Sequence, residues 1–211
     1  MEQLVNLLTA DFPYRKFGTL NPFGTTAIFS RLPMEDIRVL DLQADRSALG
    51  VRVHRHGRSI FFISAHLRAF GWPQILYFLK NGSYATALSA ARQFRIEQNQ
   101  QARILLNAIT ERQDDSVILA CDCNTKDLMS TYGLLSSQLQ VASPVIGLQP
   151  WFSMPSDQYL DINPQHVDHI FYSGMATPVV VYKLKANAGS DHTPLIVDFS
   201  LVDAGNKRKS Q

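Results

Sequence analysis

The stretch Val117-Ile118-Leu119-Ala120-Cys121-Asp122-Cys123-Asn124-Thr125 joins an apolar run to a polar cluster, and it decides the fold. The apolar half has the length of a buried strand, and its acid and amide groups follow where that strand would end. Functional side chains often lie at such ends, because a rigid scaffold holds them there at the solvent. We therefore expect Asp122 and Asn124 to lie at one edge of a sheet.

Three other segments repeat this design. They are Phe61–Leu67, which ends in Ser64-Ala65-His66-Leu67, the segment Val167-Asp168-His169-Ile170, and Ser190-Asp191-His192-Thr193-Pro194 ahead of Leu195-Ile196-Val197. Each places imidazole or carboxylate groups beside an apolar strand. The four segments together predict that acids, an amide and imidazoles meet at one end of paired sheets.

The apolar periodicity predicts alternating strands and helices along the rest of the chain. Strands are expected over residues 25–30, 37–42, 49–55, 59–67, 117–121, 167–172, 179–184 and 195–201. A hairpin turn at His56-Gly57 would join the third strand to the fourth. Helices are expected near residues 4–8, over 83–112 with an interruption at 98–101, and over 130–139. The elements favour two packed sheets covered by helices.

Composition indicates one globular domain. The chain has 211 residues, of which 45% are hydrophobic and 18% charged, so it can bury one substantial core. We expect that domain to span residues 1–202, followed by a disordered tail over 203–211. The net charge of +2 is too small to indicate a nucleic-acid binder by itself. No apolar run is long enough to span a bilayer, so the domain should be soluble.

The chain has two cysteines, Cys121 and Cys123. Residues two apart on a strand share a face but are splayed, which disfavours a disulfide between them. A zinc site would require further soft ligands, and there is no other cysteine. We therefore expect two buried thiols.

The four segments resemble, in order, the motifs of the endonuclease/exonuclease/phosphatase superfamily, which includes deoxyribonuclease I. Ser64–Leu67 resembles the family's Thr-His-Leu, and Asp122 with Asn124 resembles its Gly-Asp-Phe-Asn. Asp168–Phe171 resembles its Asp-His-Ile-Phe, and Ser190–Pro194 resembles its Ser-Asp-His-x-Pro. The resemblance implies an α/β fold, a four-layer α/β/β/α sandwich of two mixed, largely antiparallel sheets.

The resemblance also implies a metal-dependent phosphoesterase of the nuclease or phosphatase type. Such hydrolysis needs a hard divalent cation and a base, and carboxylate and amide oxygens suit Mg²⁺, with Mn²⁺ as the alternative. Asp122 and Asn124, two apart on one strand face, would orient the attacking water and hold a phosphate oxygen. The imidazole of His192 titrates near neutrality, as an acid/base group requires.

The carried-over roles complete the expected site. The family pairs the aspartate of its Asp-His-Ile-Phe motif with the last histidine, so Asp168 is expected to orient His192, and His66 to contact the phosphate or protonate the leaving group. The metal ligands are expected to be Asp191 and Asp122. The predicted catalytic residues are His66, Asp122, Asn124, Asp168 and His192.

One part of the family pattern has no counterpart here. The family begins with an asparagine-bearing strand and a Gln-Glu strand end, whose glutamate is the principal metal ligand. Glu2 stands in a helical pattern ten residues before Phe12 and is an unlikely substitute. We therefore expect the chain to be incomplete at its amino end, and the alternative function is a catalytically impaired member that acts as a binding or scaffold module. Cys121 also replaces a usual glycine, where a side chain would crowd the metal site.

The substrate class stays open among nucleic acid, lipid-linked and small-molecule phosphoesters, and no obligate protein partner is evident. Aromatic residues in the loops expected over 69–79 and 151–155 would stack on bases, grip an acyl chain, touch a bilayer interface or pack on each other. The spacing also resembles membrane-anchored bacterial members of the superfamily. An anchor in a longer parent protein would bring this domain close to a membrane.

Overall fold

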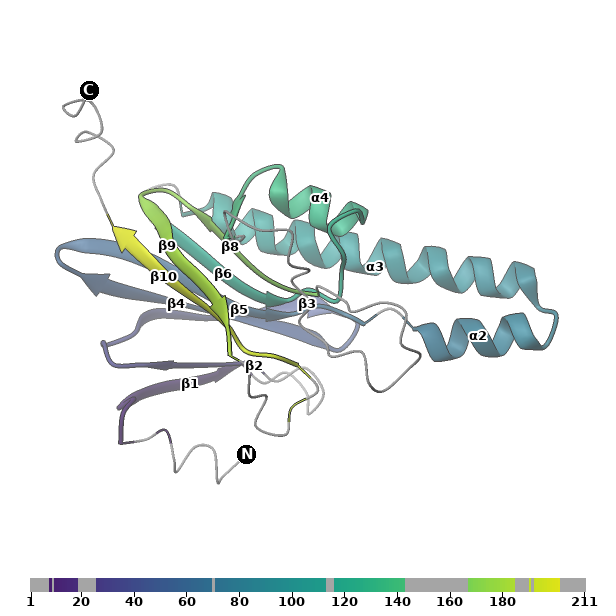
Figure 1. The fold of residues 1–211 in the computed structure, drawn as a ribbon, viewed down its shortest axis with the longest axis horizontal. Coiled ribbons are helices and arrows are strands. Elements are labelled where there is room, and N and C mark those ends of the chain that lie inside the picture. Colours follow the sequence, from purple (N-terminus) through teal and green to yellow (C-terminus); the bar gives the residue numbers. More distant parts are fainter. Residues whose placement is uncertain are drawn as a thin grey trace.

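The central element is a six-stranded mixed sheet with the strand order β3-β4-β5-β6-β8-β7 (Figure 1). The computed structural model describes residues 8, 10–18, 26–69, 71–112, 116–142, 167–184, 190 and 192–201. The strands of this sheet are β3 (Glu35–Gln43), β4 (Arg46–Arg55), β5 (Arg58–His66), β6 (Ser116–Asp122), β7 (Gln140–Val141) and β8 (Asp168–Ser173). Within this sheet, only β5 and β6 are paired in parallel. The long helix between them returns the chain to the end of the sheet where β5 begins, so that β6 can run in the same direction.

A second β layer covers one face of this sheet. It consists of two antiparallel ladders, β1 (Tyr14–Gly18) with β2 (Thr26–Ser30), and β9 (Ala176–Lys183) with β10 (Leu195–Leu201). Apolar residues of the sheet's strands alternate toward this layer, and they form two clusters: Leu49, Val51 and Val53 with Ile28, and Ile60, Ile118 and Tyr172 with Val181 and Phe199. The second sheet expected from the sequence is therefore split into two ladders.

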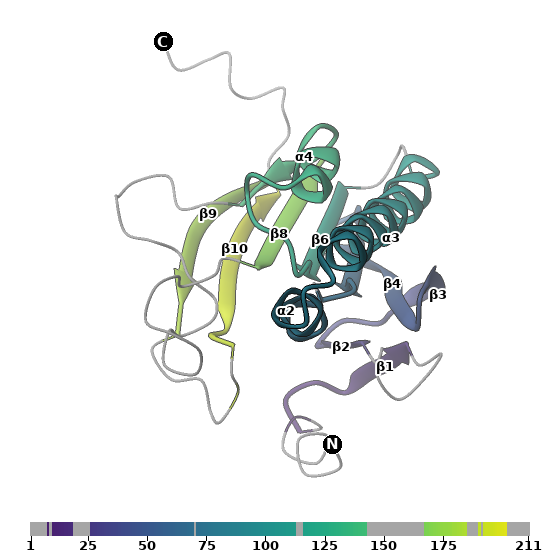
Figure 2. The same cartoon turned by 90° about the vertical axis from the view of Figure 1, so that its right-hand side faces the viewer.

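Helices cover the opposite face. They are α2 (Trp72–Lys80), α3 (Tyr84–Thr110) and α4 (Ser130–Ser136), and Figure 2 shows α3 along one side of the sheet with the two ladders on the other. The apolar face of α3 packs on the sheet through Ala102, Leu105, Leu106 and Ile109, against Phe61, Ile63, Leu119 and Phe171. This arrangement confirms the mixed α/β sandwich. No helix in the described part of the chain is long and apolar enough to cross a bilayer.

The loop expected over residues 69–79 is wrong in part, because α2 begins at Trp72. Pro73 lies in the first turn, where its missing N–H is not needed. Ile75 and Phe78, three residues apart, face Ala87 and Phe94 of α3 and form a small core of their own. The aromatic and aliphatic run thus follows a helical period.

Most other elements lie where the sequence predicts them. The turn at His56-Gly57 is confirmed, with φ of 53° and 74°, as a two-residue hairpin loop requires. Strand β1 was not predicted, because only Gly18 of its five residues is buried and no apolar alternation marks it. The helix expected near residues 4–8 and the tail at 203–211 lie outside the described residues, apart from Leu8.

Two glutamines in α3 are buried where the sequence suggested an interruption of the helix. Gln98 donates from Nε2 to the carbonyls of Arg68 at 2.6 Å and Asn124 at 3.1 Å. Gln101 accepts from the Arg68 N–H at 2.9 Å and donates to the Gln43 carbonyl at 3.1 Å. These amides satisfy backbone groups just beyond β5 and β6 and at the end of β3, so the helix stays continuous and holds three strand ends.

We expect Gln98→Ala to lower the free energy of unfolding by about 2–4 kcal/mol, since two buried carbonyls lose a donor and a cavity forms. Gln93→Ala, on an exposed position of the same helix, is the control and should change it by less than about 0.5 kcal/mol. Urea unfolding measures both. Equal midpoints for the two variants would contradict a structural role for Gln98.

Candidate active site

Strand register brings three of the predicted residues into one row. His66, the last residue of β5, lies opposite Asp122, the last residue of β6, and Asp122 lies opposite Asp168, the first residue of β8. Neighbouring residues in register point to the same side of a sheet. The three share the parity of Ile60, Ile118 and Tyr172, so they face the second β layer and not the helices.

His192 reaches this row from the segment before β10. Its Nδ1 lies 2.8 Å from Oδ2 of Asp168, a charge-assisted hydrogen-bond distance. Its backbone N–H donates to Oγ of Ser190 at 3.0 Å, which closes a local turn. The structure therefore brings together the histidine and the aspartate that the sequence paired.

The side chains of Asp122, Asp168 and His192 form a compact cluster. One oxygen or nitrogen atom of each lies within 4.8 Å of the others, as metal ligands do. A cavity of about 450 Å³ opens beside the cluster. It is lined by strand ends and by the segment before β10: Thr26, Ala27, Ser64–His66, Ala120–Asp122, Asp168–Ile170, Ser190 and His192–Leu195.

Asp122 has a strongly perturbed pKa. Burial raises the pKa of Asp122 to about 6, and repulsion from the Asp168 carboxylate acts in the same direction. The His192 imidazole, the backbone N–H of Asn124 and the Arg46 guanidinium oppose this rise. A cation bound beside these two acids would favour the ionised form of Asp122 and displace its proton to solvent.

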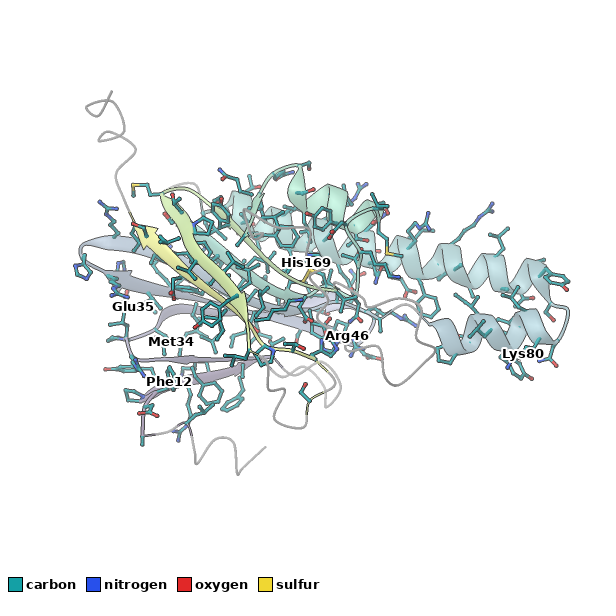
Figure 3. All side chains as sticks on the ribbon, in the orientation of Figure 1. Phe12, Met34, Glu35, Arg46, Lys80 and His169 are labelled. Carbon is teal, nitrogen blue, oxygen red and sulfur yellow. A yellow bond between two sulfur atoms is a disulfide. The ribbon has the colours of Figure 1, made fainter. Side chains whose placement is uncertain are left out.

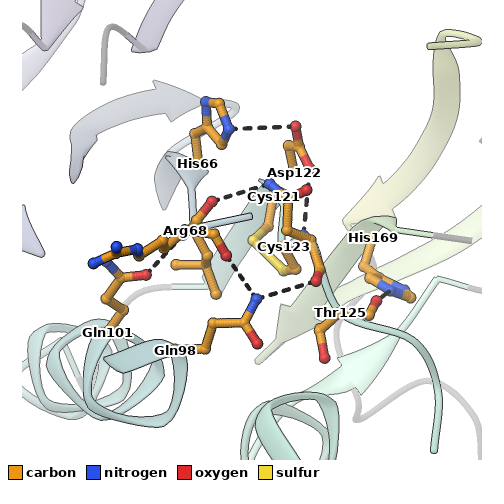
Figure 4. Close-up of a disulfide and its surroundings, with 11 residues drawn as sticks. His66, Arg68, Gln98, Gln101, Cys121, Asp122, Cys123, Thr125 and His169 are labelled. Atoms are coloured by element: carbon orange, nitrogen blue, oxygen red, sulfur yellow. Dashed lines mark hydrogen bonds and ion pairs between the residues drawn. A yellow bond between two sulfur atoms is a disulfide. The ribbon is translucent and has the colours of Figure 1, made fainter. Parts of the chain in front are cut away.

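Burial favours the neutral form of His66. Burial lowers the pKa of His66, and the positive charges of Arg46 and His192 lower it further, whereas the negative charge of the Asp168 carboxylate raises it. Its Nε2 lies 3.6 Å from Oδ2 of Asp122, which is too long for a hydrogen bond (Figure 4). The lowered pKa also weakens this contact as an ion pair, because an ion pair requires a protonated ring.

Asn124 lies differently from the expected strand geometry. Strand β6 ends at Asp122, and Asn124 follows with a φ of 46°, in the left-handed region. Its Nδ2 donates to the Leu67 carbonyl at 3.0 Å, and its N–H points to Oδ1 of Asp122 at 3.3 Å. Asn124 does not belong to the described residues that line the cavity. The backbone N–H of Asn124 therefore supports the Asp122 carboxylate from beyond the end of the strand.

The expectation of two free thiols is wrong, because Cys121 and Cys123 form a disulfide (Figure 4). Their Cα atoms are 5.0 Å apart, within the range for a disulfide. The prediction assumed that both residues lie on an extended strand, but Cys123 follows the strand end, where the chain bends and its N–H donates to the Val167 carbonyl at 3.0 Å. The bond joins the two neighbours of Asp122.

Two cations near the cluster were not predicted. Arg46, at the start of β4, lies close enough to lower the pKa values of both His66 and Asp122. Lys183, paired with Leu195 in the β9–β10 ladder, lies close enough to Asp168 for that carboxylate to raise its pKa, against a larger lowering by burial. No sequence motif predicts that Arg46 lies near the site. Lys183 could have been predicted only from its strand partner Leu195, which directly follows the Ser190–Pro194 motif.

The remaining candidate residues divide into two groups. Asp191 and Glu2, considered as metal ligands, lie outside the described residues. His169 is buried on the helix side, where its Nε2 lies 2.9 Å from the Thr125 carbonyl and its ring packs on Tyr132. These contacts indicate a structural role for His169.

The disulfide predicts that unreduced, denatured protein will resist thiol alkylation. Intact-mass measurement should show no added alkyl group before reduction and two after it, because both cysteines are in the bond. Cys123→Ser is the control, since it should leave one thiol that reacts without reduction. Alkylation of both residues in the unreduced wild-type protein would contradict the disulfide.

The raised pKa of Asp122 predicts a pH-dependent stability in metal-free buffer. The folded state binds the extra proton between the ordinary pKa of 3.8 and about 6, so the free energy of unfolding should fall as pH rises through that window. Asp122→Asn should remove this fall and be more stable than wild type at pH 7 by about 1–3 kcal/mol. Thermal unfolding with EDTA from pH 4 to 8 measures it. Asp198→Asn removes an exposed carboxylate as the control, and a wild-type stability that rises from pH 4 to 6 relative to Asp122→Asn would contradict the prediction.

Solved structures share this fold at low sequence identity. The human nocturnin catalytic domain with bound sulfate superposes with a TM-score of 0.70 at 18% identity, over 96% of this chain and 77% of that one. TDP2 of D. rerio complexed with single-strand DNA product gives 0.68 at 17%, over 94% and 81%. An endonuclease/exonuclease/phosphatase from Bacteroides vulgatus gives 0.69 at 13%, over 96% and 82%.

Sequence comparisons identify the family. No curated protein sequence matches this chain significantly. The model of the Endonuclease/Exonuclease/phosphatase family, however, matches residues 2–192, which include three of the strand-end motifs in full and the fourth as far as His192. Together with the shared fold, this match shows that the chain belongs to the endonuclease/exonuclease/phosphatase family.

Proposed function

We propose that the protein hydrolyses phosphoester bonds and depends on a divalent metal ion, Mg²⁺ first and Mn²⁺ as the alternative. The observation that carries this proposal is the cluster of Asp122, Asp168 and His192, with His66 beside it. Membership of a family of metal-dependent phosphoesterases supports it. Hydrolysis of a phosphoester requires this combination of oxygen ligands for a hard cation and an imidazole base.

The donor set fits such a metal ion. Asp122 would hold it, together with Asp191, because two hard oxygen ligands suit Mg²⁺ or Mn²⁺. The pKa of Asp122, raised by burial and by the nearby Asp168 carboxylate, also fits, since a cation would relieve this repulsion and keep Asp122 ionised. When bound, the metal would supply Lewis-acid stabilisation of charge on the phosphoryl oxygens.

The Asp168–His192 pair is the proposed base. With Nδ1 donating to Asp168 at 2.8 Å, Nε2 of His192 is left as the atom that accepts a proton from the attacking water. Asp168 holds the ring in that tautomer and stabilises it once protonated. Asn124 would support the site from behind, because its backbone N–H points to Oδ1 of Asp122 and its Nδ2 donates to the Leu67 carbonyl.

His66 and two cations would bind the phosphate. His66 would donate an N–H to a phosphate oxygen, because burial lowers its pKa and so favours the neutral ring over a protonated ring that could protonate the leaving group. Arg46 and Lys183 lie near the carboxylate cluster and would offset the charge of a phosphoester brought beside Asp122 and Asp168.

The substrate class stays open among nucleic acid, lipid-linked and small-molecule phosphoesters. Single-strand DNA product is bound by the structurally similar TDP2 of D. rerio, which supports single-stranded DNA as one class to assay. A panel of bis(p-nitrophenyl) phosphate, single-stranded DNA and a phospholipid would separate the three classes.

We expect metal-dependent turnover of at least one member of this panel, lost with EDTA and restored by Mg²⁺ or Mn²⁺. Asp122→Ala and His192→Ala should each lower kcat at least about 100-fold, because they remove the metal ligand and the base. His66→Ala should lower it about tenfold or more. His54→Ala, an exposed histidine near the far end of β4, is the control and should retain full activity.

Equal activity in wild type, Asp122→Ala and His192→Ala would overturn the assignment of this site. No turnover of any substrate, with metal binding intact by calorimetry, would favour the alternative of a catalytically impaired binding or scaffold module.

A further inference from the structure

A helical hairpin extends away from the sheet at one end of the molecule. It consists of α2 and the first part of α3, residues 71–96, and Figure 1 shows it projecting beyond the strands. Its two helices pack on each other through Ile75 and Phe78 on α2 and Ala87 and Phe94 on α3. The hairpin therefore has a core of its own and leaves its outer faces to solvent.

One of those faces is apolar. Leu76 and Leu79 follow Ile75 and Phe78, which face the hairpin core from α2, and Leu88 follows the buried Ala87 of α3. One step along a helix turns the side chain by about 100°. Two antiparallel helices seen from one end wind in opposite senses, so these steps lead from the shared core to the same side of the hairpin. Tyr84, one turn before Leu88, extends this face.

These side chains are open to solvent. The exposed fractions are 48% for Leu76, 38% for Leu79, 69% for Tyr84 and 56% for Leu88. On the other side of the hairpin, the same helical geometry places the polar residues Gln74, Thr86 and Gln93, together with Tyr77, which is 64% exposed. The three exposed leucines therefore lie on one face of the hairpin, where a free-standing element would be polar.

The charge of the hairpin is of one sign. Residues 71–96 contain Lys80, Arg92 and Arg95 and no aspartate or glutamate. Arg95 follows Phe94 as Leu88 follows Ala87, so it lies on the apolar face, and Arg92 borders it. Lys80 lies at the end of the hairpin (Figure 3). Exposed leucines and a tyrosine bordered by cations match the apolar interior and anionic headgroups of a lipid surface.

We propose that this face, defined by Leu76, Leu79, Tyr84 and Leu88 with Arg92 and Arg95, docks on the surface of an anionic lipid bilayer. Leucine side chains enter the acyl boundary, tyrosine favours the headgroup level, and the cations meet lipid phosphates. A nucleic acid fits less well, because Leu76, Leu79 and Leu88 are aliphatic and only Tyr84 of this face offers a ring for a base to stack on. The hairpin begins at Trp72, six residues after His66, so docking would hold the cavity close to the lipid.

Vesicle flotation tests this docking and needs no substrate. Wild-type protein should float with vesicles of phosphatidylglycerol and phosphatidylcholine, and at least about tenfold less with phosphatidylcholine alone. Leu76→Glu/Leu88→Glu should reduce binding to the anionic vesicles at least about tenfold. Thr86→Glu/Gln93→Glu is the matched control, because it adds the same two charges to the polar side of the same hairpin and should retain most of the binding. Circular dichroism and unfolding midpoints confirm that both variants fold.

Several results would overturn the proposal. Wild-type protein that does not float with anionic vesicles would exclude the bilayer as the occupant. An equal loss of binding in both double variants would mean that the change in net charge, and not the apolar face, determines binding. A dimer in light scattering that dissociates in Leu76→Glu/Leu88→Glu would identify a second copy as the occupant, and single-stranded DNA binding lost in the same variant would identify a nucleic acid.

Discussion

The site depends on the register of three neighbouring strands. The parallel pairing of β5 with β6 sets His66 against Asp122, and the antiparallel pairing of β6 with β8 sets Asp122 against Asp168. A slip of one residue would turn the Asp122 side chain to the helix face, among Leu119 and Phe171. The apolar alternation of β6 thus fixes both the core and the position of the acid, and the same burial raises the pKa of Asp122.

The strand ends need support, because backbone groups beyond a sheet lose their ladder partners. Gln98 and Gln101 of α3 provide it by bonding main-chain groups of Gln43, Arg68 and Asn124. The disulfide between Cys121 and Cys123 constrains the chain on either side of Asp122. The position of Asp122 is therefore fixed by the pairing of β6, by the contacts of α3 with the neighbouring strand ends, and by the disulfide between its two sequence neighbours. Loops contribute only His192 to the described cluster.

Much of this arrangement is readable in the sequence, because strand ends obey local rules. An apolar run beside polar groups identified the ends of β5 and β6 and the start of β8, and the family resemblance implied that His192 is the partner of Asp168. Local rules fail where tertiary contacts decide. The disulfide required the bend after Asp122, α2 required a partner helix for Ile75 and Phe78, and the buried glutamines required unpaired carbonyls from three distant segments. Arg46 and Lys183 reach the site only through strand pairing, and no pattern in their own neighbourhoods announces them.

Helix α3 is one continuous element of 27 residues, about 40 Å long at the usual rise per residue. Leu88 lies near its beginning, and Gln98 and Gln101 lie near its middle, with no break between them. A surface docked on the start of this helix, as proposed, would therefore lie at a fixed height and tilt from Asp122. A phosphoester would then have to lie at the matching depth to reach Asp122 and Asp168, so the length of a helix remote from the chemistry would select among substrates.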